Sequence, residues 1–217
     1  MAERERRLLS TIDYENGYSL YVGIPFCPTT CLYCSFTSFP IVKWEKRMDL
    51  YKEALFKDME DVAEQMKDRP LSTIYFGGGT PTSLNPQDLD EILTKVEELF
   101  PVEQAVEFTV ESGRPDSITR EKLQVLRNHG ISRISINPQT MKQATLDLIG
   151  RRHTVEDVKE KFLLARELGF DNINMDLIVG LPEETIDDVR QTMEEIKALG
   201  PDSVTVHSLA IKRAARL

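Results

Sequence analysis

Residues 21–34 read YVGIPFCPTTCLYC: a short apolar run leads through a proline into three closely spaced cysteines. The β-branched, aromatic and apolar residues at 18–24 predict a β-strand that stops at Pro25. Cys27, Cys31 and Cys34 then follow with the spacing Cys-x-x-x-Cys-x-x-Cys, and they are the only cysteines in the chain. An odd number of clustered thiols in a reducing compartment does not fit a disulfide framework. The loop therefore predicts one of two roles for these thiols: they are ligands of a metal, or they are redox groups themselves.

Beyond this loop, short apolar runs alternate with longer amphipathic stretches. Further strands are predicted at residues 72–76, 105–110, 132–137, 172–179 and 203–209. Helices are predicted at 44–66, 86–100, 120–129 and 185–199, and a helical region after the fourth strand breaks at Gly150 and resumes over 154–169. Strand and helix recur every 30 to 40 residues, roughly one βαβ step, which implies a parallel sheet with outer helices. The pattern alone fits both a flat doubly wound sheet and a (β/α) barrel.

Composition narrows the class of protein. The 217 residues carry 27 Lys and Arg against 36 Asp and Glu, a net charge of −9. Such an acidic chain does not fit a dedicated nucleic-acid-binding protein, which needs clustered basic side chains. No apolar run approaches the ~20 residues of a membrane helix, and the mixed charges of residues 3–7 do not fit a secretory signal. We therefore expect a cytoplasmic monomer without a nucleic-acid or membrane partner.

Two segments are also expected from the sequence. Residues 1–17 form an N-terminal lead segment, and residues 18–217 form one core domain. Six strand–helix units are visible, whereas a complete eight-unit barrel takes ~250 residues. Few residues follow the sixth strand, so we expect a core that lacks its last helix and any C-terminal domain.

The number of cysteines is informative about the kind of metal site. A [4Fe–4S] cluster normally takes four cysteine ligands, so three ligands leave one iron open. An open coordination position is where metal sites carry out chemistry. The alternatives are three unrelated thiols, or a zinc knuckle completed by a histidine. The histidines are His129, His153 and His207; none lies in the loop, and we interpret them as structural or surface residues.

Other chemically informative residues lie near the ends of predicted strands. The run GGGT at 77–80 allows close approach of a ligand but also suits an ordinary tight turn. Glu111 ends the third strand, where its carboxylate either accepts hydroxyl hydrogen bonds or is simply solvated. Gln139 lies just past the fourth strand, Arg151 at the helix break, and Asp176 within the apolar fifth strand. A structural Arg151–Asp176 salt bridge is the alternative to a binding site there.

These motifs resemble the radical S-adenosylmethionine (SAM) superfamily, and within it the oxygen-independent coproporphyrinogen III oxidase/dehydrogenase family. Residues 34–40, CSFTSFP, resemble the branch of that family found in firmicute-type bacteria. The resemblance covers residues 18–217 and implies an α/β fold, a partial (β/α)6 TIM-like barrel. In this family, three cysteines hold a [4Fe–4S] cluster, and the amino and carboxylate groups of SAM chelate the fourth iron. Electron transfer then cleaves SAM to methionine and a 5′-deoxyadenosyl radical.

The resemblance also implies roles for individual residues. It makes Cys27, Cys31 and Cys34 the cluster ligands. Contacts to SAM, as one molecule or two, are implied for Tyr21, Tyr33, Gly78, Gly79, Thr80, Glu111, Gln139, Arg151, Asp176 and Ala210. Two positions depart from the family pattern: Gly23 stands where much of the family has histidine, and Phe36 where some members carry an additional cysteine.

The implied activity is that of an oxidoreductase of haem biosynthesis. It would convert propionates of coproporphyrinogen III to the vinyl groups of protoporphyrinogen IX, with flavodoxin or ferredoxin as the electron donor. The anionic porphyrinogen needs local cations, and basic residues near predicted strand ends either supply them or belong to a solvated face. They are Arg114, Arg151, Arg152, Lys212 and Arg213. A haem chaperone with the same barrel, or a zinc-bound structural domain, is the alternative.

Overall fold

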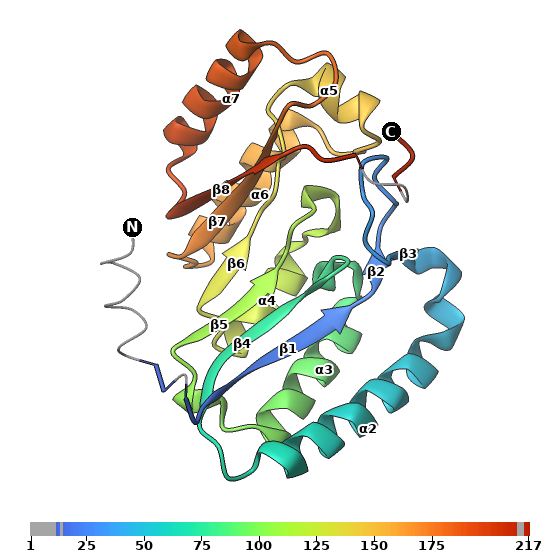
Figure 1. Ribbon diagram of the computed structural model, residues 1–217, viewed down its shortest axis with the longest axis vertical. Coiled ribbons are helices and arrows are strands. Elements are labelled where there is room, and N and C mark those ends of the chain that lie inside the picture. Colours follow the sequence, from blue (N-terminus) through green and yellow to red (C-terminus); the bar gives the residue numbers. More distant parts are fainter. Residues whose placement is uncertain (1–11, 14, 212–214) are drawn as a thin grey trace.

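Six parallel strands form one continuous sheet in the order β1-β4-β5-β6-β7-β8 (Figure 1). This computed structural model describes residues 12, 13, 15–211 and 215–217; most of the predicted lead segment, together with Lys212 and Arg213, lies outside the described residues. The strands are β1 (Tyr18–Ile24), β4 (Leu71–Gly78), β5 (Glu107–Glu111), β6 (Arg133–Ser135), β7 (Ile173–Val179) and β8 (Ser203–Ser208). Because all neighbouring strands are parallel, their carboxyl ends meet at one rim.

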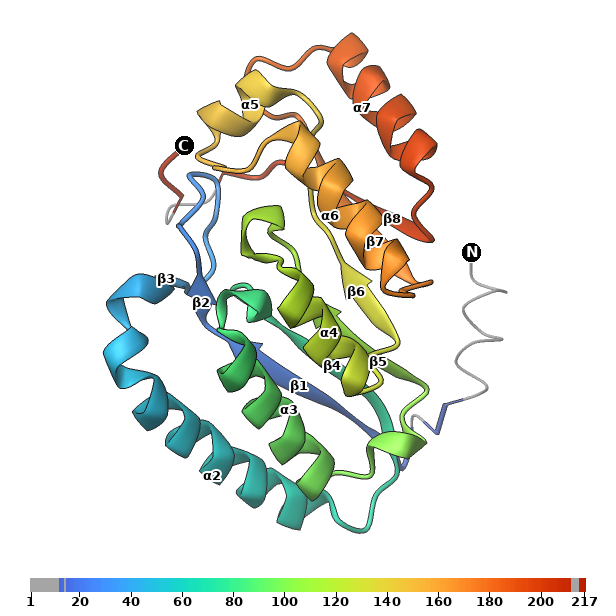
Figure 2. The ribbon, with the colours of Figure 1, turned by 180° about the vertical axis from the view of Figure 1, so that it is seen from behind.

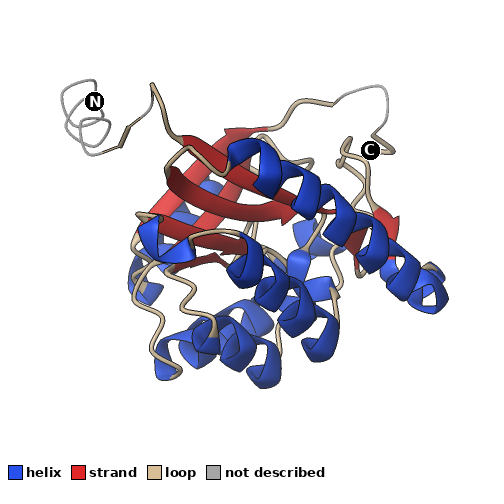
Figure 3. Cartoon of the chain, turned by 90° about the horizontal axis from the view of Figure 1, so that it is seen from below, coloured by secondary structure: helices blue, strands red, loops and turns tan. Residues whose placement is uncertain are grey.

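Helices between the strands cover one face of the sheet. They are α2 (Met48–Met66), α3 (Pro86–Leu99), α4 (Arg120–Asn128), α5 (Gln143–Leu148), α6 (Val155–Glu167) and α7 (Ile186–Leu199). Seen from behind, α3, α4 and α6 lie in front of the strands, and α2 runs along the side of β1 (Figure 2). The strands curve into an open arc (Figure 3). A doubly wound sheet carries helices on both faces. The arrangement therefore confirms the partial barrel.

The core lies between the sheet and these helices, because alternate strand residues point to opposite faces. Along β1, Val22 and Ile24 are buried, whereas Tyr21 and Gly23 lie on the opposite, exposed face. α3 buries its apolar stripe at helical spacing, as its sequence predicts. No helix in the described part of the chain is both long and apolar enough to cross a membrane.

Some element boundaries differ from the sequence prediction. The second strand continues through Gly77 and Gly78, because these glycines pair with the end of β1. The predicted helix at 44–66 begins only at Met48, and two 3-10 turns, Ile41–Lys43 and Glu45–Arg47, precede it. Between these turns Trp44 has a φ of −116°, and its ring packs against Phe26 and Phe39. The helix itself begins after Arg47, whose φ of −120° lies outside helical geometry.

A two-residue parallel pair closes the base of the cysteine loop. β2 (Phe26–Cys27) pairs with β3 (Phe39–Pro40). In addition, the backbone N–H of Phe39 donates to the carbonyl oxygen of Pro25 over 2.8 Å. The chain between β2 and β3 is therefore a closed loop at the carboxyl end of β1.

Candidate functional site

The carboxyl ends of the strands and the cysteine loop enclose a cavity of about 520 Å³. All three cysteines line it, so their thiols open onto a common space. Every residue assigned to the site by resemblance, except Tyr21, lines the same cavity. Lining residues that those assignments missed are Ser35, Phe36, Ser38, Gly113, Arg114, Asn137, Ile178, His207, Ser208 and Leu209. The parallel topology thus gathers residues that are up to 183 positions apart, from Cys27 to Ala210.

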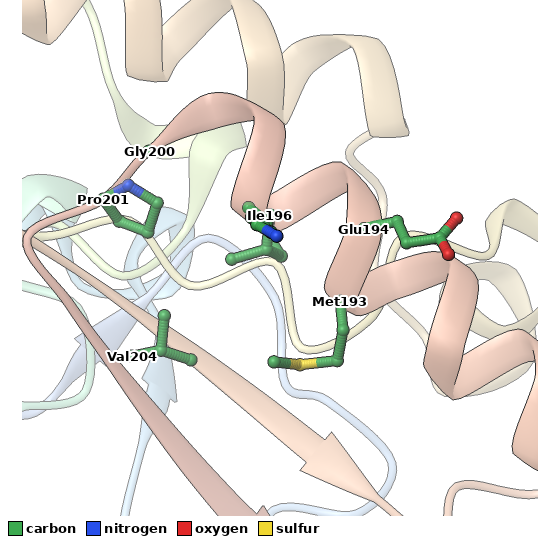
Figure 4. A pocket seen from close by; sticks show the side chains of 7 residues that line it. Met193, Glu194, Ile196, Gly200, Pro201 and Val204 are labelled. Atoms are coloured by element: carbon green, nitrogen blue, oxygen red, sulfur yellow. The ribbon is translucent and has the colours of Figure 1, made fainter.

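A second hollow, of about 430 Å³, lies between α7 and the start of β8 (Figure 4). Met193, Ile196 and Val204 face it, whereas the carboxylate of Glu194 points away. Its lining is mainly apolar and contains no thiol or imidazole. Because it lies at the opposite end of β8 from the cysteines, it has no part in their chemistry.

Other segments hold the cysteine loop from outside. The backbone N–H of Leu32 donates to the Ile149 carbonyl oxygen over 3.0 Å, and the Leu32 carbonyl accepts from the Arg216 N–H over 2.7 Å. The Arg216 guanidinium also donates to the carbonyl oxygen of Thr30 (3.1 Å). The loop is therefore anchored between the helix break at residue 150 and the last described residues.

Two of the thiols lie close to polar side chains. Cys27 Sγ and Thr80 Oγ1 are 3.5 Å apart, and Arg114 Nη1 lies 3.5 Å from Cys31 Sγ. Burial raises the pKa of the Cys27 thiol above its ordinary value, although the hydrogen bond with Thr80 opposes this. Cys27 is therefore held as a thiol until a metal displaces the proton.

The glycine run presses the end of β4 against the chain that leads into Cys27. The N–H groups of Gly79 and Thr80 donate to the carbonyl oxygens of Ile24 and Phe26, both over 2.7 Å. A Cβ atom on Gly79 would lie only 2.5 Å from the Phe26 oxygen. Gly78 has a φ of +101°, which L side chains rarely adopt. These glycines are therefore required for close backbone approach and do not form an ordinary tight turn.

Glu111, at the end of β5, belongs to a chain of aromatic and acidic contacts. The Tyr75 hydroxyl donates to Glu111 Oε1, and the Tyr21 ring stacks on Tyr75 with centroids 6.0 Å apart. Burial raises the pKa of Glu111, the Tyr75 hydrogen bond opposes this, and the nearby Asp176 charge adds to it. Tyr21 is 61% exposed and lies outside the cavity lining. It contacts this group of residues through Tyr75, which the sequence did not reveal.

The chain beyond β6 is joined to β7 by hydrogen bonds. Gln139 has a φ of +71°, an uncommon conformation for a residue with a Cβ. Its N–H donates to the carbonyl oxygen of Asp176 (3.0 Å), and its own carbonyl accepts from Ile178 (2.9 Å). Asn137 Oδ1 accepts from the Asp176 N–H (3.2 Å). These bonds maintain a strained backbone beside the cavity, which is typical of functional sites.

Arg151 is a buried cation whose hydrogen-bond partners are neutral. Nη2 donates to the Tyr33 hydroxyl (2.8 Å) and Nη1 to the Asn137 carbonyl (3.2 Å), whereas Nε has no partner. Within the described ranges, no carboxylate lies within 4.0 Å of Arg151, so the alternative Arg151–Asp176 salt bridge is not formed. Asp176 Oδ1 instead accepts from Asn174 Nδ2 (2.7 Å). A buried guanidinium of this kind suits the carboxylate of a ligand.

The other basic residues expected near the site differ in whether they line the cavity. Arg114 lines the cavity beside Arg151, whereas Arg152 is exposed and lies outside the lining. The prediction for Lys212 and Arg213 falls outside the described residues.

The three histidines have different surroundings. His129 is bonded to Glu97 (2.8 Å) and Asp90 (3.0 Å), as expected of a structural residue. His207 is exposed, as expected of a surface residue, and it also lines the cavity. The register of β8 against β7 places it beside Ile178. His153 is 1% exposed, and neither ring nitrogen has a hydrogen-bond partner.

His153 should make the fold sensitive to acid. Burial lowers its pKa from 6.5 to about 4, so below pH 6.5 the unfolded chain binds a proton that the folded chain refuses. Stability is therefore lost as pH falls from 6.5 towards 4, by about 2 kcal/mol at pH 5. His153→Leu should remove this contribution, as measured by urea unfolding at pH 7 and pH 5. An unchanged loss of stability between the two pH values would contradict it.

The donor set fits an iron–sulfur cluster better than a single metal ion. Among the residues that the structure describes, no group of three His, Cys, Asp or Glu side chains could hold a single metal ion. A cube binds each thiolate through a different iron, so its ligands stand farther apart than those of one ion. The three cysteines open onto one cavity, so their thiolates are the ligands available to such a cluster.

Comparison with known proteins decides the family. Residues 21–196 match the model of the Radical SAM superfamily. The chain belongs to the radical SAM superfamily. Membership in this superfamily implies a [4Fe–4S] cluster and SAM, as the cysteine motif predicts.

The relatives lie in one group of radical SAM proteins. The chain is 47% identical over 202 residues to the oxygen-independent coproporphyrinogen-III oxidase-like protein HemZ of Bacillus subtilis, covering 92% of the chain and 40% of HemZ. It is 35% identical over 195 residues to the heme chaperone HemW of the same organism, covering 89% and 51%. These matches confirm the coproporphyrinogen oxidase-like family.

A solved structure agrees with this placement. Coproporphyrinogen III oxidase (HemN) from Escherichia coli matches with a TM-score of 0.82 and 30% identity, over 97% of this chain and 51% of HemN. The chain thus spans about half the length of these relatives, or less.

Proposed function

We propose that this chain is the cluster- and SAM-binding core of an oxygen-independent coproporphyrinogen III dehydrogenase. One observation carries the proposal: the three thiols open onto the same cavity as the buried Arg151 and the carboxylates of Glu111 and Asp176. A ligand with a carboxylate, an amino group and ribose hydroxyls is complementary to that set of side chains.

Each wall of the cavity would bind a different part of SAM. Glu111 would accept hydroxyl hydrogen bonds from a ribose, and the backbone of residues 78–80 would bind the amino group. Arg151 would hold a carboxylate, because no carboxylate described in this structure compensates its charge. Gln139, Asp176 and Ala210, with Tyr33 beside them, would complete contacts to a second SAM molecule.

When bound, the cluster and SAM supply a radical that takes a hydrogen atom from the substrate. Each of the two propionates that are converted would lose a β-hydrogen atom to that radical, CO2, and one electron to an external acceptor, and a vinyl group would remain. The residues of this chain orient the reactants and keep water out. Ile178 and Leu209 pack together beside the site and offer an apolar wall to a macrocycle.

We further propose flavodoxin or ferredoxin as the electron donor to a cytoplasmic, monomeric protein.

The test is conversion of coproporphyrinogen III. The reconstituted protein is incubated anaerobically with SAM, a reductant and the porphyrinogen, and the products are separated after oxidation to porphyrins. Time-dependent formation of protoporphyrin supports the dehydrogenase. The likeness to the heme chaperone HemW favours a second candidate: binding of one haem per chain without any conversion of coproporphyrinogen would support a chaperone and overturn the dehydrogenase.

Asp176→Asn separates a binding role from a structural one. Asp176 has no cationic partner within 4.0 Å among the described residues, and asparagine keeps the oxygen that accepts from Asn174. We therefore expect a nearly unchanged melting temperature and a normal iron content. The variant loses a hydrogen bond that the charged carboxylate would accept from SAM. SAM-dependent turnover should therefore fall roughly tenfold to a hundredfold. Asp187→Asn, at an exposed acid on α7, is the control. A large drop in melting temperature, with unchanged turnover per folded molecule, would contradict the binding role.

A further inference from the structure

Arg114 reaches from the β5–α4 connection into the cysteine loop. It is 3% exposed. Its Nη1 donates to the carbonyl oxygen of Thr29 over 2.9 Å and to Cys31 Sγ over 3.5 Å. One guanidinium nitrogen therefore contacts both the loop backbone and the sulfur of an assigned cluster ligand.

Asp116 fixes the orientation of this guanidinium. Its Oδ1 accepts from Arg114 Nε (2.9 Å), and its Oδ2 accepts from Arg114 Nη2 (2.6 Å). Such a two-point contact leaves the planar group one orientation. The remaining nitrogen, Nη1, is thereby aimed at the loop. Because Arg114 is already paired with Asp116, it is also a poor candidate for binding a substrate propionate.

We propose that Arg114 is a positioning residue that seats the cysteine loop and raises the reduction potential of the cluster. Hydrogen bonds to cluster sulfurs and nearby charge are among the factors that set such potentials. A donor on Cys31 Sγ stabilises the more negative, reduced cluster, so electrons enter more readily. The inference rests on Cys31 as a cluster ligand and is independent of the porphyrinogen chemistry.

The test compares three variants by the midpoint potential of the reconstituted cluster, measured by titration with electron paramagnetic resonance. Arg114→Gln removes the charge, and Arg114→Lys keeps a charge without the fork. Arg152→Gln makes the same change of net charge at a neighbouring exposed position outside the cavity. Iron and sulfide content is measured for each protein.

Arg114→Gln should shift the potential to more negative values. The ratio of reduced to oxidised cluster at a fixed donor potential should fall about tenfold, which corresponds to about 59 mV for one electron. Arg114→Lys should shift it less, and Arg152→Gln should leave it unchanged. A fully loaded Arg114→Gln protein with the wild-type potential would overturn the inference.

Failure to bind a cluster has a different meaning for the Arg114 variant and for the wild-type chain. If Arg114→Gln binds no cluster, the measurement passes to Arg114→Lys, for which a more negative potential supports the inference and the wild-type potential overturns it. If the wild-type chain itself binds no cluster, the assignment of the cysteines fails and Arg114 has no cluster to position.

Discussion

Replacing any one of Cys27, Cys31 or Cys34 with alanine is expected to abolish cluster assembly and all cleavage of SAM. The three thiols are the only cysteine ligands that the chain can supply. With one of them removed, a second iron loses its protein ligand and the cube cannot be retained. Iron and sulfide per chain, together with the brown chromophore, measure the loss after anaerobic reconstitution.

Thr37→Ala is the matched control for this experiment. Thr37 is an exposed residue of the same loop and does not line the cavity, so its variant should assemble a normal cluster. Circular dichroism shows whether the cysteine variants keep the fold. If any one of them carries a full complement of iron and sulfide, that cysteine is not a ligand.

Gly79→Ala should damage the site through a backbone clash. Its Cβ atom would lie 2.5 Å from the Phe26 oxygen and 2.9 Å from the Ile24 oxygen. Both atoms belong to backbone that already binds this turn through two 2.7 Å hydrogen bonds, so neither can move aside alone. Overpacking of this kind costs about 1–3 kcal/mol, and the melting temperature should fall by several degrees. Because Phe26 precedes Cys27, cluster content should fall as well.

Gly23→Ala isolates the effect of the backbone clash. Gly23 pairs with Gly77 in the same part of the sheet, but its nearest neighbour would be a Tyr21 ring atom at 3.3 Å. That side chain is exposed and free to adjust, so the variant should assemble its cluster normally. Equal melting temperatures and iron contents for the Gly79 and Gly23 variants would contradict the argument.

The strands could be predicted because most of their information is local. Each is an apolar or alternating run bounded by glycine, proline or polar residues, and all six lie within a few residues of their predicted positions. The errors arise where a partner decides the conformation. Gly77 and Gly78 resemble a turn in isolation, but both pair with β1 and belong to β4. α2 begins later than its sequence pattern predicts, after two 3-10 turns.

The residues of the site could likewise be predicted only in part. The cysteines, Glu111 and Asp176 could be identified from the sequence. Three clustered thiols indicate a common ligand, and an acid within or at the end of an apolar run indicates a polar partner. Tyr75 and Asn137 are not conspicuous, because their contacts depend on which strand lies beside them. The pairing of Arg114 with Asp116, and the lack of a described carboxylate near Arg151, also appear only in three dimensions.

Cleavage of SAM by the reconstituted wild-type chain tests the central claim most directly. If the cysteine cavity holds a [4Fe–4S] cluster with SAM beside it, the protein should contain about four iron and four sulfide per chain. With a strong reductant, it should then release 5′-deoxyadenosine and methionine from SAM. A fully loaded, reduced protein that yields no 5′-deoxyadenosine above the level of iron-free protein would contradict the account.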